Sequence, residues 1–169
     1  MRSLINPRQS TPISYPASPL NGSCDTQRAA RPGEPAPDAR MRGCHLSQHF
    51  GHGFVALWFC EEPAASPSLV ALGAECEACG LASLTDLTDL TDLTNLTLLR
   101  ITGQPSAQTH TLFDEHGEAW QRYSAREGDV FLVRPDGYLL ATWAKPQADA
   151  LRTALRPFRQ RRLEPGERL

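Results

Sequence analysis

The sequence lacks the features that mark several large classes of protein. No apolar run among its 169 residues approaches the ~20 that a membrane-spanning helix needs, and the N-terminus has no continuous apolar stretch like that of a secretory signal. The formal net charge is only -2, so no overall basic field attracts nucleic acid or an anionic membrane. These absences predict a cytoplasmic protein that binds neither a membrane nor nucleic acid.

Motifs of common enzyme sites are missing as well. The chain has no G-x-S-x-G, no G-x-x-x-x-G-K-[ST], no G-x-G-x-x-G and no legible Ser–His–Asp order. Gly51 and Gly53 precede the apolar run 54–59, whereas the glycines of a dinucleotide-binding loop must follow a strand. The sequence therefore predicts no cofactor bound by this chain itself and no catalytic residue of these kinds.

The cysteines are the sharpest candidates for chemistry. Their number is five, and an odd count favours reduced thiols in a reducing compartment. Cys76 and Cys79 have the C-x-x-C spacing of redox pairs. They fall roughly two to three turns into a predicted helix, beside Glu75 and Glu77, where neither the helix dipole nor the local charge favours a thiolate. Cys60 follows the first predicted strand as a single cysteine. A thiol-disulfide oxidoreductase or a peroxiredoxin-like enzyme would have to use Cys60 or the Cys76/Cys79 pair.

A second cluster could in principle bind a metal ion. Cys44, His45, His49 and His52 lie close together, with Cys60 and the later cysteines as further potential ligands. A structural zinc site needs four ligands, usually in two closely spaced pairs. Adjacent residues such as Cys44 and His45 are poorly placed to bind one ion, so the sequence predicts no metal site and a group of solvated histidines.

The composition divides the chain into unequal parts. Half of the 14 prolines lie before residue 40, so residues 1–39 cannot form a long helix or a central strand and are predicted to be an extended arm. This arm carries apolar residues such as Tyr15, which suggests that it lies against another surface. Residues 40–163 have the pattern of one globular domain, and residues 164–169 are a short tail.

Within the globular part, the hydrophobic pattern predicts strands and helices in alternation. The short apolar run 54–59, rich in Val, Trp and Phe, predicts a first strand, and 96–102, which ends before Gly103, predicts a second. Helix formers predict a helix at 68–79 that stops at Gly80. A short helix at 118–124 precedes two β runs, 129–133 and 138–143, which Asp136-Gly137 joins as a hairpin. Pro146 opens a last helix. This order predicts a thioredoxin-like α/β fold, a mixed sheet with flanking helices whose first two strands are parallel.

Residues 84–95 consist of four consecutive Leu-Thr-Asp or Leu-Thr-Asn units. A step of three residues drifts by about 60° on an α-helix, so the leucines mark neither one helical face nor a strand. Repeats of three residues are also far shorter than the roughly 20–50 residues of repeat folds. We interpret residues 84–95 as a low-complexity insertion between a helix and a strand.

Several short motifs, taken in order, resemble one family. They are Asn6-Pro-Arg-Gln-Ser10 with Tyr15 and Ser18-Pro-Leu20, Arg31-Pro-Gly-Glu-Pro-Ala-Pro-Asp38, Thr111-Leu-Phe-Asp-Glu-His-Gly117, Arg122-Tyr-Ser-Ala125, and Val133-Arg-Pro-Asp-Gly-Tyr138 with Trp143. The pattern is similar to the C-terminal part of flavin-dependent aromatic-ring monooxygenases, such as 3-(3-hydroxyphenyl)propionate hydroxylase, phenol hydroxylase and the polyketide and rifampicin hydroxylases. It covers nearly the whole chain except the Leu-Thr-Asp insertion.

The resemblance implies a thioredoxin-like accessory domain of a hydroxylase that uses FAD, NAD(P)H and O₂. The flavin fingerprints and the substrate pocket of the family lie upstream of the matched region, and none is present in this chain. Residues 1–39 would then be a remnant of the end of the flavin catalytic domain, and that domain or subunit would be the partner. In such relatives this domain lacks a dithiol and is linked to packing and to oligomerisation, so a homo-oligomer is a further expectation.

Overall fold

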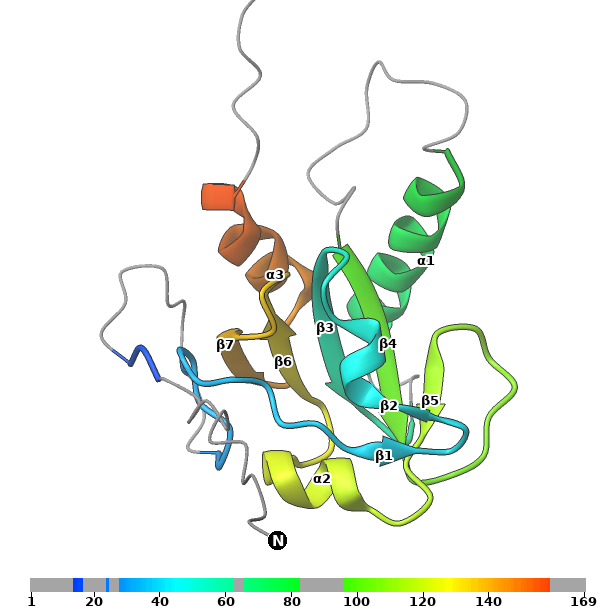
Figure 1. Cartoon of the computed structure of the whole chain (residues 1–169). Coiled ribbons are helices and arrows are strands. Elements are labelled where there is room, and N and C mark those ends of the chain that lie inside the picture. The colour runs from blue at the N-terminus through cyan, green and yellow to red at the C-terminus, as the bar shows by residue number, and fades with distance from the viewer. Residues whose placement is uncertain (1–13, 17–23, 25–27, 63–65, 83–95, 159–169) are drawn as a thin grey trace, which may run out of the picture.

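The computed structural model describes residues 14–16, 24, 28–62, 66–82 and 96–158, with the side chains of 77–82 excepted. Its centre is a five-stranded sheet in the order β5-β4-β3-β6-β7 (Figure 1). The strands are β3 (Phe54–Phe59), β4 (Leu96–Thr102), β5 (Thr111–Phe113), β6 (Asp129–Val133) and β7 (Leu139–Ala144). The helices are α1 (Pro67–Ala82), α2 (Glu118–Tyr123) and α3 (Ala148–Leu155), and a small hairpin is formed by β1 (Arg40–Met41) and β2 (Cys44–His45) before the 3₁₀ helix η1 (Leu46–His49).

The strand pairing confirms the predicted fold class. β3 pairs with β4 in parallel and with β6 antiparallel, and β6 pairs antiparallel with β7. The two apolar runs at 54–59 and 96–102 are the parallel strands, as predicted. β5 adds a further parallel strand beside β4, which the predicted order did not include. The chain therefore has a thioredoxin-like α/β fold.

The central strand β3 separates two hydrophobic cores. Successive side chains of a strand point to opposite faces. Ala56, Trp58 and the following Cys60 pack with α1 and α3, whereas Leu57 and Phe59 pack with α2 and η1. Figure 1 shows α1 and α3 on one side of the sheet and α2 with the β1–β2 hairpin on the other. An apolar strand buried on both faces explains why the run 54–59 has no polar alternation.

Two predicted helix boundaries are wrong. Helix α1 continues through Gly80 to Ala82, so this glycine does not end it. Helix α3 begins at Ala148, two residues after Pro146, and its N-cap is Gln147. Glycine raises the cost of a helix by only about 1 kcal/mol, which contacts elsewhere along the helix can offset. The Leu-Thr-Asp insertion at 84–95 lies outside the described residues.

Residues 33–35, in the last part of the proline-rich stretch before Arg40, lie along the outer edge of β7. Gly33 N–H donates to Leu139 O at 2.8 Å, and Leu139 N–H donates to Glu34 O at 2.9 Å. The Tyr123 hydroxyl donates to Pro37 O at 2.8 Å from the α2 side. The two bonds to Leu139 cover backbone groups of β7 that would otherwise lie at an open sheet edge. The boundary at residue 39 stays a prediction, although residues 33–37 contact the domain directly.

A buried ion pair fixes the chain at Arg28. Arg28 donates two hydrogen bonds to the Asp129 carboxylate, at 2.5 and 3.1 Å, and the side chains are only 10% and 2% exposed. Asp129 also accepts the Arg126 N–H at 2.9 Å, at the turn that leads into β6. The carboxylate thus links the segment before the domain to the first residue of a central strand.

Removing Arg28 should destabilise the whole domain. We expect Arg28→Met to lower the free energy of unfolding by about 3 kcal/mol, because it leaves the buried Asp129 carboxylate without its ion-pair partner. Arg31→Met, at an exposed position three residues further on, is the matched control and should change it by less than about 0.5 kcal/mol. Urea denaturation of both variants measures the difference. Equal stabilities would contradict this role for Arg28.

Candidate functional site

The predicted thiol position lies where two parallel strands end. The carboxyl ends of the parallel strands β3 and β4 lie at the same edge of the sheet. Strand β6, later in the chain, pairs with the other side of β3. In open α/β sheets, ligands bind at such a crossover point. Cys60 is the first residue after β3, and the loop before β6 reaches the same place, since Gly128 N–H donates to Phe59 O at 2.8 Å. This edge is therefore the candidate site.

Arg100, on β4, holds the loop that follows Cys60. Its Nε donates to Cys60 O at 2.9 Å, and its Nη2 donates to Glu61 O at 2.8 Å. Its Nη1 donates to Gln108 Oε1 at 2.8 Å. The rigid guanidinium fork suits this simultaneous grip on several acceptors. The loop is thereby tied to the end of β4 through its own backbone.

The Glu61 side chain ties the same loop to the end of β4 a second time. Thr102 Oγ1 donates to Glu61 Oε2 at 2.7 Å, and Gly103 N–H donates to Glu61 Oε1. Hydrogen bonds to an ionised acceptor are stronger than neutral ones. The Glu61 carboxylate thus links the loop after β3 to the end of β4.

Glu127 closes the site from the β6 side. Its carboxylate accepts the backbone N–H of Glu61 at 3.0 and 3.1 Å and that of Glu62 at 3.5 Å. These two donors follow Cys60 directly, so they are the groups at this edge that could stabilise a negative charge on a reacting atom. Glu127 occupies them instead. We call Cys60, Glu61, Arg100, Thr102 and Glu127 the β3-end network.

Cys60 is buried within the β3-end network and is chemically disfavoured as a nucleophile. Its side chain is 1% exposed. Burial, followed by the hydrogen bond to Glu127 and the charge of that carboxylate, raises the pKa of Cys60 to about 12. The thiolate is the reactive form of cysteine, so this thiol stays protonated near neutral pH.

The other predicted redox residues lie away from this edge. Cys76 is the tenth residue of the helix Pro67–Ala82, and it is buried in the core between α1, α3 and the sheet. A position roughly two to three turns from the helix start receives little help from the dipole. The side chain of Cys79 lies outside the described part of the chain. Cys60 and Cys76 contribute to the same core, but the C-x-x-C does not lie at the helix start.

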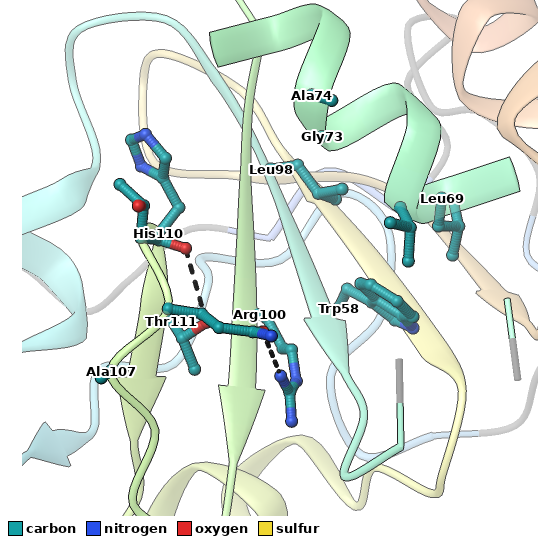
Figure 2. Close-up of a pocket in the computed structure, with 12 residues that line it drawn as sticks. Trp58, Leu69, Gly73, Ala74, Leu98, Arg100, Ala107, His110 and Thr111 are labelled. Atoms are coloured by element: carbon teal, nitrogen blue, oxygen red, sulfur yellow. Dashed lines mark hydrogen bonds between the residues drawn. The ribbon is translucent and has the colours of Figure 1, made fainter. Parts of the chain in front are cut away.

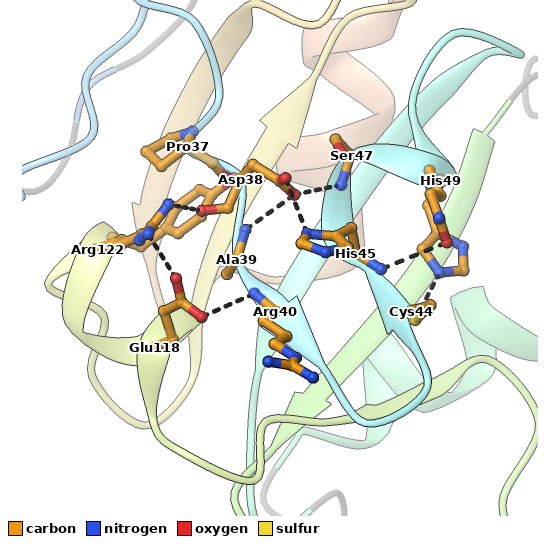
Figure 3. A network of polar contacts seen from close by, with 12 residues as sticks. Pro37, Asp38, Ala39, Arg40, Cys44, His45, Ser47, His49, Glu118 and Arg122 are labelled. Atoms are coloured by element: carbon orange, nitrogen blue, oxygen red, sulfur yellow. Dashed lines mark hydrogen bonds and ion pairs between the residues drawn. The ribbon is translucent and has the colours of Figure 1, made fainter.

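The histidine cluster separates into two pairs (Figure 3). Cys44 Sγ lies 3.7 Å from His49 Nε2, and His45 Nδ1 lies 3.2 Å from Asp38 Oδ2. His52 is exposed in the bend that follows. Across the described ranges, no three Cys, His, Asp or Glu side chains form a group that could hold a metal ion. The same ranges contain no helix long and apolar enough to cross a bilayer.

Asp38 organises the turn that carries these pairs. Its carboxylate accepts the N–H groups of Ser47 at 2.8 Å and Ala39 at 2.9 Å, in addition to its contact with His45. Burial alone raises the pKa of Asp38, but the hydrogen bonds from Ser47, Ala39 and His45 outweigh it and hold this pKa below its ordinary value. The Asp38 backbone carbonyl accepts a bond from Arg122 on α2.

A shallow groove lies beside the β3-end network (Figure 2). It has a volume of about 380 Å³ and runs between α1 and the loop before β5, with Trp58 and Leu98 among its lining residues. Trp58 Nε1 is buried and has no hydrogen-bond partner within the described structure. Figure 2 shows His110 and Arg100 on the strand side and Gly73 on the helix side. No sequence motif marked this groove, because residues from four separate segments form it.

Comparisons with known proteins agree on the fold. No protein-family model and no curated protein matches this sequence. Among solved structures, aklavinone-11 hydroxylase in complex with FAD and aklavinone matches with a TM-score of 0.56 and 22% identity. That match covers 86% of this chain and 26% of the hydroxylase chain, so this chain spans about a quarter of that protein. Peroxidoxin BcpB from Mycobacterium tuberculosis matches with a TM-score of 0.52 and 18% identity, covering 77% of this chain and 99% of the other. Identities this low show a shared fold.

The β3-end network predicts the effect of one substitution on Cys60. We expect Glu127→Gln to lower the pKa of Cys60, because the negative charge beside the thiol is removed, although burial still keeps this pKa above its ordinary value. Alkylation of Cys60 by iodoacetamide at about pH 8.5 should accelerate by roughly tenfold per pKa unit lost. Peptide mass spectrometry measures the rate, and Glu115→Gln in an exposed turn is the control. An unchanged rate would show that Glu127 does not restrain this thiol.

Asp38 should make the stability of the fold depend on pH. A carboxyl whose pKa is lower in the folded than in the unfolded state stabilises the fold above about pH 4, and this contribution is lost as the pH falls through the folded pKa. We therefore expect Asp38→Asn to lower the free energy of unfolding clearly at about pH 7 and much less at about pH 3. Urea denaturation at both pH values measures this, with Glu115→Gln, in an exposed turn, as control. The same loss at both pH values would argue against the assignment.

Proposed function

We propose that this chain is a non-catalytic, thioredoxin-like accessory domain of a flavin-dependent aromatic hydroxylase. The observation that carries the proposal is the β3-end network. In it, the carboxylate of Glu127 takes the backbone donors after Cys60, and the thiol itself is buried with a raised pKa. A domain that keeps this fold while its thiol site is filled by structural hydrogen bonds is suited to packing rather than to redox chemistry.

The link to a flavin enzyme is supported by two separate likenesses. The ordered sequence motifs resemble the C-terminal part of aromatic-ring monooxygenases. The fold is shared with a segment of aklavinone-11 hydroxylase that corresponds to 86% of this chain. Under this proposal, a separate flavin-binding domain or subunit supplies FAD, uses NAD(P)H and O₂, and hydroxylates an aromatic substrate.

The described residues do not fit FAD themselves. Phosphates of such cofactors bind to free backbone N–H groups at the carboxyl ends of parallel strands, usually at the start of a helix. Here the ends of β3 and β4 are closed by Arg100, and the carboxylate of Glu127 occupies the backbone donors of the intervening loop. A pyrophosphate at this edge would face that carboxylate. The flavin therefore belongs to the partner in this proposal.

We expect the arm, residues 1–39, to be the segment that connects this domain to its partner. Residues 33–37 run along β7, and Arg28 is fixed to Asp129 at the entrance to this segment. The residues before Arg28 would continue from a flavin domain, as the resemblance implies for 1–39. Self-association of this chain is the other partner arrangement that the resemblance suggests.

A thiol-disulfide oxidoreductase or peroxiredoxin-like enzyme remains the second candidate. The fold shared with peroxidoxin BcpB, over 77% of this chain and 99% of that chain, favours it. The state of Cys60 argues against it, because a peroxidatic or attacking cysteine must reach the thiolate form. The distance of Cys76 from the start of α1 argues in the same direction.

Two measurements on the purified full chain test the proposal. We expect no reduction of insulin disulfides or of hydrogen peroxide above the level of a Cys60→Ser, Cys76→Ser double variant. We also expect the tagged chain, isolated from its native host, to co-purify with an FAD-containing hydroxylase polypeptide identified by its flavin absorbance and by mass spectrometry. Turnover that depends on Cys60 or Cys76 would reject the accessory role and favour the second candidate. Isolation without any flavoprotein would reject the link to a hydroxylase.

A further inference from the structure

A thiol and an imidazole meet on the face of the domain opposite α1 and α3. Cys44 lies on β2 and His49 at the end of η1, and Cys44 Sγ lies 3.7 Å from His49 Nε2 (Figure 3). Both side chains are half-buried, so the pair borders solvent on one side and core on the other. A cysteine within reach of a histidine nitrogen is the minimum arrangement for an activated sulfur nucleophile.

The backbone around the pair is fixed from several directions. The Asp38 carboxylate accepts the Ser47 N–H at 2.8 Å and thereby holds the start of η1. Leu46, in the same turn, is fully buried against the core. Cys44 is in register with Met41 in the β1–β2 hairpin, and Met41 is 3% exposed. The separation between sulfur and imidazole is thus set by the fold rather than by two free surface side chains.

The environment of His49 keeps its imidazole neutral. Burial, followed by repulsion from His110, lowers the pKa of His49 below its ordinary value of about 6.5. A neutral imidazole has one nitrogen that accepts a proton, whereas a protonated ring has none. Near neutral pH, His49 is therefore able to act as a base.

From this geometry we infer that Cys44 is the reactive thiol among the cysteines whose side chains the structure describes, and that it forms a mixed disulfide with a low-molecular-weight disulfide, with His49 as the base. The thiol proton passes to His49 as Cys44 Sγ attacks one sulfur of R–S–S–R. A Cys44–S–S–R bond forms, the R–S–S–R bond breaks, and RS⁻ leaves and takes the proton from the imidazolium. Cys44 is oxidised by the half of the disulfide that is reduced to RSH. This inference does not depend on the proposed hydroxylase partner.

The other described thiols provide internal comparisons. Cys60 is buried beside the Glu127 carboxylate, and its pKa is raised. Cys24 is exposed, and the hydroxyl of Thr142 contacts its sulfur at 3.6 Å. If exposure alone governed reactivity, Cys24 would react faster than the half-buried Cys44. If the histidine governs it, the order is reversed.

Reaction of the full chain with oxidised glutathione at about pH 7 tests the inference. Peptide mass spectrometry follows the adduct at each cysteine. We expect the adduct to form at Cys44 about tenfold faster than at Cys24, and His49→Gln to slow the Cys44 reaction by about tenfold or more. His52→Gln, an exposed histidine in the neighbouring bend, should leave it unchanged.

Two outcomes would overturn the inference. One is an adduct that forms faster at Cys24 than at Cys44 in the unmodified chain, a comparison that needs no variant and no assumption about folding. The other is a Cys44 rate that is the same in His49→Gln as in the unmodified chain, with circular dichroism showing that the variant is folded. A Cys44 rate lowered equally by His49→Gln and His52→Gln counts with the second outcome, because it leaves no specific role for His49.

Discussion

The hydrogen bonding of β3 to a strand on each side determines where every other part of this domain can lie. β3 pairs with β4 in parallel and with β6 in the opposite direction, so the loop after Phe59 meets both the end of β4 and the start of β6. Arg100 and Glu127 reach Cys60 from these two neighbours. Because the strand is buried on both faces, its apolar side chains also connect the two cores. The β3-end network is a consequence of this central position.

The same edge of the sheet can serve chemistry or structure, and here the contacts favour structure. A reactive thiol requires free backbone donors, a partly exposed sulfur and positive charge nearby. After Cys60, the backbone N–H groups donate to the Glu127 carboxylate, and the sulfur of Cys60 is buried. The Arg100 guanidinium donates to the backbone carbonyls of Cys60 and Glu61. The half-buried Cys44, on the opposite face, lies 3.7 Å from His49 Nε2, which can accept the thiol proton. The buried thiol after β3 and the thiol that we infer to be reactive thus pack on opposite faces of the sheet.

The main strands could be predicted from the sequence, but the contacts between residues far apart in the sequence could not. The run 54–59 could be predicted because apolar and aromatic residues dominate a strand buried on both faces, and the run 96–102 because its leucines form a short apolar stretch that ends before Gly103. The end of α1 at Ala82 could not, since Gly80 is a weak stop signal when the rest of the helix packs well. Glu127 lies 66 residues from Glu61, and Arg28 lies 101 residues from Asp129, so no local pattern could pair them. The structure confirms that Cys60 directly follows the first predicted strand. The burial of Cys60 could not be predicted from the sequence and is seen only in the structure.

The protonation state of Cys60 is the most direct test of the central claim that the β3-end network replaces thiol chemistry. Selective ¹³C labelling of cysteine allows the Cβ chemical shift of Cys60 to be followed by NMR between about pH 6 and pH 10, a range that spans the ordinary thiol pKa of about 8.5. The account predicts a Cys60 shift that stays at its thiol value throughout this range. A titration of Cys60 with a midpoint at or below about pH 8 would contradict the account, because a thiolate would then form at the site that Glu127 and burial are held to suppress.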